Sequence, residues 1–166
     1  MKKLFLFSLL AIGFATTAQS QEIAKNALGL RLGDGDGFGA EISYQRGLGA
    51  NNRLELDLGW RDSNHYDAFR LTGLYQWVFP IEGDFNWYVG AGGGLGGYDT
   101  DDDYDFDNND HDDSGMYGFV AGDIGVEYNF NFPLLLSLDF RPEIGFNDID
   151  DDDFDFDIAL GIRYQF

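Results

Sequence analysis

The stretch DFDFDIALGIRYQF, residues 153–166, ends the chain and decides the fold. Large apolar side chains occupy every even position of this stretch, and small or polar side chains occupy the odd positions. A strict period of two predicts a β-strand whose two faces meet different environments. The alternation continues to an aromatic residue at the last position, Phe166, whereas chain ends are usually polar and frayed. We therefore expect an ordered C-terminal strand with one strongly apolar face.

Seven further segments repeat this alternation. The complete set of expected strands is 27–32, 38–45, 54–61, 69–79, 85–96, 123–130, 134–146 and 153–166. Tight turns are expected at 47–52, 82–84 and 131–133, a short hairpin at 34–37, and polar, mostly longer links elsewhere. Short turns at one end and longer links at the other are typical of an all-β, eight-stranded antiparallel up-and-down transmembrane β-barrel.

The size of such a barrel indicates which face points outward. An eight-stranded barrel has an interior just wide enough for its own side chains, so rows of large apolar residues cannot all fit inside it. The opposite face is rich in glycine and short polar groups, which do fit. Aromatic residues also bracket the apolar band, as the two interfaces of a bilayer favour. The alternative is a soluble lipocalin-like ligand-binding barrel, which would turn the apolar face inward.

The N-terminus has the features of an export signal. A basic start at Met1-Lys2-Lys3 precedes an apolar run over residues 4–14, which is too short to span a bilayer. A small-x-small cleavage pattern follows at Ala18-Gln19-Ser20. We expect residues 1–20 to be a cleaved signal peptide, with Ala18 as an alternative cut, and residues 21–166 to be the barrel domain.

Composition excludes several classes of function. The 166-residue chain has no cysteine, and therefore neither a disulfide framework nor a thiolate metal site. Its formal net charge of −20 repels nucleic acid and attracts cations.

The ending Tyr164-Gln165-Phe166 on an alternating strand resembles the C-terminal signal of Gram-negative outer-membrane proteins. With the signal peptide, the eight strands and the chain size, it makes most of residues 24–166 similar to the small barrels of the outer-membrane protein A and X type. The resemblance implies a place in the cell outer membrane, among its lipid and lipopolysaccharide. It also implies that the barrel-assembly machinery reads Tyr164 and Phe166. We expect a monomer.

The small and polar face of the strands carries charges of both signs. Charges inside a narrow barrel are costly unless they are paired, so we expect an ion-pair network that fills the lumen. The alternative is a small cation-selective channel of the porin kind. The candidate lumen residues are Arg31, Glu41, Glu55, Asp57, Arg61, Arg70, Asp123, Glu127, Asp139, Arg141, Glu143, Asp155, Asp157 and Arg163.

Two places depart from the regular pattern. Pro142 lies inside an expected strand and cannot donate to a neighbour, which predicts a bulge or an end of regular pairing there. Tyr117 and Phe119 fall on the lumen face if the alternation extends back from Ile124, whereas a bulge near Gly122 would turn them outward. The glycine-rich run 90–97 is expected to give room to large lumen side chains.

Two acidic clusters lie at the end with the longer links. Residues 99–113 contain nine aspartates, and a second cluster covers 148–157. Carboxylates suit hard cations, so Ca²⁺ or Mg²⁺ is a candidate ligand, although Asn108 and Ser114 break an EF-hand pattern. The alternative is a solvated acidic surface. The candidate metal ligands are Asp101, Asp103, Asp105, Asp107, Asp150 and Asp152.

Catalysis is not expected. His65 and His111 lie in polar links beside serine and acidic residues, but such link composition produces a Ser/His/acid set by chance. We expect no catalytic residues and no further cofactor, and a structural or surface-interaction role.

Overall fold

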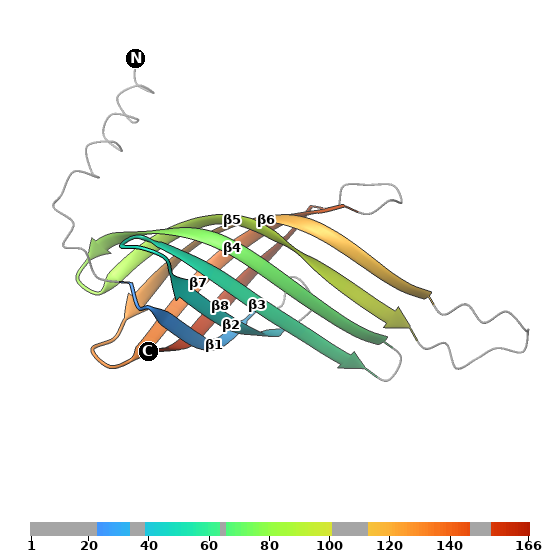
Figure 1. Ribbon diagram of the computed structural model, residues 1–166, viewed down its shortest axis with the longest axis horizontal. Helices are drawn as coiled ribbons and strands as arrows, with labels where there is room; N and C mark the ends of the chain where they lie inside the picture. Colours follow the sequence, from blue (N-terminus) through green and yellow to red (C-terminus); the bar gives the residue numbers. More distant parts are fainter. Residues whose placement is uncertain (1–22, 34–38, 64–65, 101–112, 147–153) are drawn as a thin grey trace, which may run out of the picture.

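The computed structural model describes residues 23–33, 39–63, 66–100, 113–146 and 154–166. The strands in these ranges are β1 (Asn26–Leu32), β2 (Ala40–Gly47), β3 (Asn52–Ser63), β4 (Tyr66–Glu82), β5 (Phe85–Thr100), β6 (Asp113–Asn129), β7 (Leu134–Phe146) and β8 (Phe154–Gln165). Each strand pairs antiparallel with its neighbours in the chain, and β8 pairs with β1 (Figure 1). The predicted eight-stranded closed barrel is confirmed.

The last residue of the chain takes part in closing the barrel. β1 and β8 form six residue pairs, beginning with Ala27 opposite Gln165. Beyond them, Asn26 and Phe166 exchange two backbone hydrogen bonds, with N···O distances of 3.1 and 2.9 Å. The C-terminus is therefore held in the sheet, as its uninterrupted alternation predicts.

The two ends of the barrel differ. The turns β2–β3, β4–β5 and β6–β7 are short and lie at the end where the chain terminates (Figure 1). In the β4–β5 turn, Gly83 adopts a φ of +60°, a conformation that favours glycine. At the opposite end the wall is uneven, because β4, β5 and β6 have 17, 16 and 17 residues whereas β1 and β2 have 7 and 8. We name these the turn end and the outer end.

Burial alternates along the strands with apolar residues outside and polar residues inside. On β1, Leu30 is 48% exposed, whereas the next residue, Arg31, is 1% exposed. On β8, Ile158 is 58% exposed and its neighbour Asp157 is 1% exposed. A soluble barrel with an apolar interior is therefore excluded, and an outer surface of this kind needs a hydrocarbon environment. The described residues contain no helix that is long and apolar enough to cross a bilayer.

Aromatic side chains gather on the outside near the turn end. Phe79 and Trp87 stack with ring centroids 4.8 Å apart, and Phe85 lies 4.7 Å from Tyr128. Such a belt of rings matches the interface between hydrocarbon and headgroups.

Pro142 interrupts one ladder without shifting it. On its two sides, Ala121 pairs with Glu143 and Ile124 pairs with Phe140, so β6 and β7 keep one register across the gap. The ladder between β7 and β8 continues through Pro142. The missing donor thus ends regular pairing locally, and no bulge forms between β6 and β7.

The suggested bulge near Gly122 is wrong. β5 and β6 pair without a register shift from Phe85 to Thr100, so the alternation of β6 extends back unchanged. Phe119 is 6% exposed and lies inside the barrel, and Tyr117 packs against it.

The candidate functional site in the barrel lumen

Buried charges of both signs line the lumen. In the described residues they comprise five arginines and eight carboxylates. The arginines are Arg31, Arg53, Arg70, Arg141 and Arg163, and the carboxylates are Glu41, Glu55, Asp57, Asp123, Glu127, Asp139, Glu143 and Asp157. Strand alternation brings them together, because each occupies an inward position of its strand. The interior is thus a packed layer of ionic side chains with more negative than positive groups.

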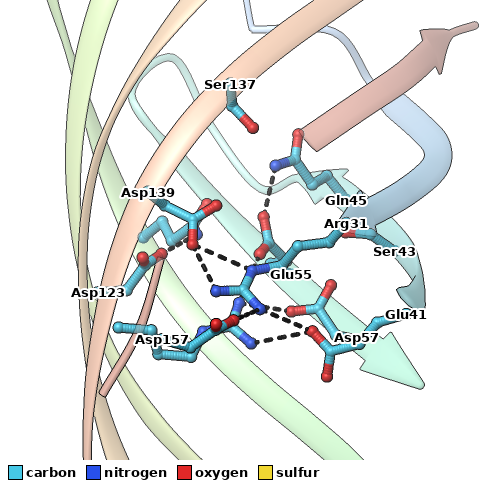
Figure 2. A network of polar contacts seen from close by, with 12 residues as sticks. Arg31, Glu41, Ser43, Gln45, Glu55, Asp57, Asp123, Ser137, Asp139 and Asp157 are labelled. Atoms are coloured by element: carbon cyan, nitrogen blue, oxygen red, sulfur yellow. Dashed lines mark hydrogen bonds and ion pairs between the residues drawn. The ribbon is translucent and has the colours of Figure 1, made fainter. Parts of the chain in front are cut away.

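Arg31 on β1 joins three other strands (Figure 2). Its Nη1 donates to Glu41 Oε2 at 2.9 Å and to Asp157 Oδ2 at 2.7 Å. Its Nε and Nη2 both donate to Asp139 Oδ1, at 3.0 and 2.6 Å. A planar guanidinium with several donors suits this arrangement, in which one cation binds carboxylates from β2, β7 and β8.

Arg141 reaches across the whole lumen. It projects from β7, and its Nη2 donates to Asp57 Oδ2 at 2.7 Å and to Glu55 Oε1 at 3.1 Å, both on β3. Four strand steps separate β3 from β7 in either direction around the closed ring, so the two strands form opposite walls. The ion pairs of Arg141 therefore cross the barrel at mid-height.

Neutral hydroxyl groups complete the same layer. Arg163 Nε donates to Ser43 Oγ at 2.9 Å, and its Nη1 donates to Ser137 Oγ at 2.8 Å. Its Nη2 forms an ion pair with Glu55 Oε2 at 3.2 Å, and Gln45 Nε2 donates a hydrogen bond to the same oxygen. Serine fits where β2, β7 and β8 leave little space around the guanidinium.

Arg53 also lies in the lumen, nearer the turn end, although it was not among the expected lumen residues. Its Nη1 donates to Glu127 Oε2 at 2.6 Å, its Nε donates to Gln76 Oε1 at 2.6 Å, and its guanidinium carbon lies 4.7 Å from the centre of the Tyr88 ring. Arg53 was missed because the expected strand began one residue later. Arg53 is two residues before Glu55 and four before Asp57, so it has the same inward phase of the alternation. That phase is the sequence signal that places it in the lumen.

An apolar cluster, which we name the apolar layer, begins in the lumen at Leu74, opposite Glu55, and extends toward the outer end. Leu74, Phe119 and Ala121 form a buried cluster against which Tyr117 packs. The guanidinium carbon of Arg70 lies 4.2 Å from the centre of the Phe119 ring, within the range of a cation–π contact. Arg70 also forms an ion pair with Glu143.

Glycines on β5 make room for these rings. Gly94 lies opposite Phe119, and Gly96 lies opposite Tyr117. A Cβ atom on Gly96 would come within 2.4 Å of the Tyr117 ring, so a larger residue cannot share this space without moving the tyrosine. Gly94 and Gly96 thus give room to large lumen side chains, as was expected of the glycine-rich run 90–97.

Other candidate residues lie elsewhere. Asp155 is exposed rather than inside the network, and its carboxylate accepts a hydrogen bond from the backbone of Phe156 at 2.7 Å. The side chain of Arg61 lies outside the described part of the chain. So do His65, His111 and the six candidate metal ligands, Asp101, Asp103, Asp105, Asp107, Asp150 and Asp152. Among the residues that the structure describes, no group of three or more His, Cys, Asp or Glu side chains is arranged to hold a metal ion.

Comparison with known proteins places this fold among solved barrels. No protein-family model and no curated protein matches the sequence. The N-terminal β-barrel domain of Pseudomonas aeruginosa OprF matches with a TM-score of 0.63 and 15% identity, over 85% of this chain and 96% of that chain. Neisserial surface protein A matches with a TM-score of 0.59 and 13% identity, over 85% of this chain and 94% of that chain.

A third similar structure is Ail, the attachment invasion locus protein of Yersinia pestis. It matches with a TM-score of 0.53 and 15% identity, over 87% of this chain and 100% of that chain. These neighbours are eight-stranded outer-membrane barrels, and at such identities the likeness extends to the fold. The chain therefore has the fold of the small eight-stranded outer-membrane β-barrels.

Proposed function

We propose that this protein is an outer-membrane barrel with a closed lumen that serves envelope structure or surface interaction, without enzymatic activity. A signal peptide over residues 1–20 directs its export and is then cleaved. The observation that carries the proposal is the ion pair between Arg141 and Asp57, which come from opposite walls of the barrel. The distance from Arg141 Nη2 to Asp57 Oδ2 is 2.7 Å.

Two layers in series support a closed lumen. The ionic layer fills the middle, and the rings of Phe119 and Tyr117, with the Arg70–Glu143 ion pair beside Phe119, fill the lumen between it and the outer end. An ion that crossed the barrel would have to displace the paired charges of the middle and then pass the Phe119 and Tyr117 rings, where it would lose hydration. Both events cost free energy. The first requires the ion pairs to separate, and the second requires the aromatic rings to move.

Fractionation tests the location and the fold together. We expect the protein in the outer-membrane fraction, soluble only with detergent, and with a gel mobility that changes when the sample is boiled. Recovery in the soluble fraction, with a mobility that does not depend on heating, would contradict the proposed location.

Planar-bilayer recording tests the closed lumen. We expect no steady large conductance from purified wild-type protein. One observation favours the second candidate, a cation-selective channel, because the described lumen has eight buried carboxylates against five arginines. Steady conductance with cation selectivity would establish that candidate instead. Phe119→Ala, which removes the ring beside Arg70 but leaves the ion pairs of Arg31 and Arg141 in place, serves as a comparison and is also expected to stay closed.

The proposed partners follow from this location. Outer-membrane lipid and lipopolysaccharide surround the barrel, the assembly machinery reads the ending at Tyr164 and Phe166, and the folded protein is a monomer. We further propose that the acidic segments bind divalent cations loosely and bridge them to lipopolysaccharide phosphates. Calorimetry with Ca²⁺ tests this, and the absence of both binding heat and a shift in melting temperature would reject it.

A further inference from the structure

An outward-facing row of residues crosses four strands near the outer end. Trp60 on β3 lies opposite Phe69 on β4, Phe69 lies opposite Gly97 on β5, and Gly97 lies opposite Met116 on β6. Three of these four residues have large apolar side chains, and the fourth has none. The row therefore has walls on both sides and a gap at Gly97.

A groove of about 490 Å³ lies over this row, and the Phe69 ring, which covers Gly97, lines its floor. Trp60 and Met116 are 73% and 74% exposed and project as its outer walls. The Phe69 ring leans into the gap, because a Cβ atom on Gly97 would meet Phe69 Cε1 at 2.6 Å. The groove is consequently mostly apolar, with the Trp60 ring on one side and the flexible thioether of Met116 on the other.

We propose that this groove binds one acyl chain of lipopolysaccharide; the inference rests on the outer-membrane location proposed above. The next outward row toward the turn end consists of the exposed Leu58, Leu71 and Leu95, so the groove adjoins the apolar belt of the barrel and hydrocarbon is the medium that reaches it. It lies toward the outer end, opposite the short turns, which in outer-membrane barrels face the periplasm. An occupant at this height belongs to the outer leaflet, whose glycolipid is lipopolysaccharide.

The size of the groove favours a lipid chain over a second copy of the protein. Eight residues line it, whereas a stable protein interface uses about 20–30 residues on each side. Between apolar surfaces inside a membrane, close packing rather than the hydrophobic effect provides the attraction. A groove walled by Trp60 and Met116 gives one flexible chain more van der Waals contact than a smooth barrel surface does.

A carboxylate lies where the headgroup of this lipid would be. Asp67 is exposed and borders the groove two residues closer to the outer end than Phe69. A divalent cation bound there can bridge the carboxylate to a lipid phosphate, because hard cations bind both kinds of oxygen. The groove and Asp67 thus match the acyl chain and the headgroup of the same lipid.

Lipid retention in a mild detergent tests this inference. The wild-type barrel, the double variant Trp60→Ala/Met116→Ala and the groove-filling variant Gly97→Leu are purified from outer membranes, and bound lipids are identified by native mass spectrometry. The matched control is Phe156→Ala/Ile158→Ala, which removes one aromatic and one aliphatic residue from β8, both exposed to lipid. We expect one retained lipopolysaccharide per wild-type barrel and per control barrel, and a severalfold loss in both groove variants.

Retention of phospholipid instead, equal retention in all four proteins, no retained lipid, or a dimer joined through the groove would overturn the inference. Heat-modifiable mobility of each variant shows whether its barrel has assembled. If Gly97→Leu fails to assemble, the double variant decides. If the protein is a membrane barrel but retains no lipid, only the proposed binding of lipopolysaccharide in the groove is contradicted. If the protein is recovered in the soluble fraction, the proposed function is contradicted.

Discussion

The middle of the lumen and its outer part are filled in different ways, although both lie inside the same narrow barrel. Around Arg31 and Arg141, long charged side chains from β1, β2, β3, β7 and β8 meet and pair. Around Phe119 and Tyr117, aromatic rings pack against Gly94 and Gly96 of β5. The first layer depends on charge balance, and the second depends on shape.

The two layers should respond differently when one side chain is removed. Loss of an arginine from the middle leaves carboxylates buried without a partner, and that cost can exceed the attraction that was lost. Loss of a ring from the outer layer leaves a cavity, which neighbouring side chains can partly fill. Mutations should therefore rank the two layers by their effect on the free energy of unfolding.

The largest effect is expected for Arg31→Met. The variant leaves Glu41, Asp139 and Asp157 without their shared cation, and breaking a buried ion pair costs about 3–5 kcal/mol. Denaturant unfolding in detergent micelles, followed by gel mobility, measures the change. Arg46→Met is the control because Arg46 is exposed, and its effect should stay below about 0.5 kcal/mol.

Phe119→Ala should come next. Truncation of a buried phenylalanine costs about 3–5 kcal/mol in a rigid core, and here the nearby Arg70 side chain can move into the space, so we expect about 3 kcal/mol. Phe119→Leu keeps most of the volume and should cost less. If Phe119→Ala destabilises the barrel more than Arg31→Met under the same conditions, the ranking of the two layers is wrong.

The two layers also differ in how well the sequence predicts them. The alternation assigned the charged residues of the middle layer to the lumen because a polar residue at an inward position stands out between apolar neighbours. It did not predict the partners, since Arg141 pairs across the lumen with residues more than 80 positions away. Pairing of that kind depends on the closure and register of the whole barrel.

The outer layer was harder to predict. Tyr117 and Phe119 are apolar residues at inward positions, so the alternation alone was ambiguous and a bulge was a reasonable alternative. The deciding signal was on another strand, in the glycines at 94 and 96 that lie directly opposite them. Arg53 shows one remaining limit, because strand ends cannot be located to within one residue from a pattern. Asp155 shows another, because it has the inward phase of β8 but lies near the outer end of the strand, where it is exposed.

A third prediction tests whether the outer layer depends on shape. Gly96→Ala places a methyl group within 2.4 Å of the Tyr117 ring, and such overpacking costs about 1–3 kcal/mol. In a Tyr117→Ala background the same change should cost little, because the ring that it meets is absent. A double-mutant cycle measures this coupling, and additive effects would show that the ring and the glycine do not share space.

The smallest expected effect belongs to the neutral part of the middle layer. Ser137→Ala removes the hydroxyl that accepts from Arg163 Nη1 at 2.8 Å, and a bond from a charged donor contributes about 1.5–3 kcal/mol when its partner stays buried. We expect about 1 kcal/mol, because Arg163 keeps Ser43 and Glu55 as partners.

The double variant Ser43→Ala/Ser137→Ala then sharpens the comparison between the layers. If the middle layer depends on charge balance, the guanidinium of Arg163 still has Glu55 beside it, and the two losses should add to less than the effect of Arg31→Met. If the double variant is as destabilised as Arg31→Met, hydrogen-bond satisfaction rather than charge balance holds the middle of the barrel together. The distinction matters for closure, because a layer that depends on hydroxyl groups can admit water in their place, whereas uncompensated buried carboxylates can only be relieved by rearrangement of the lumen.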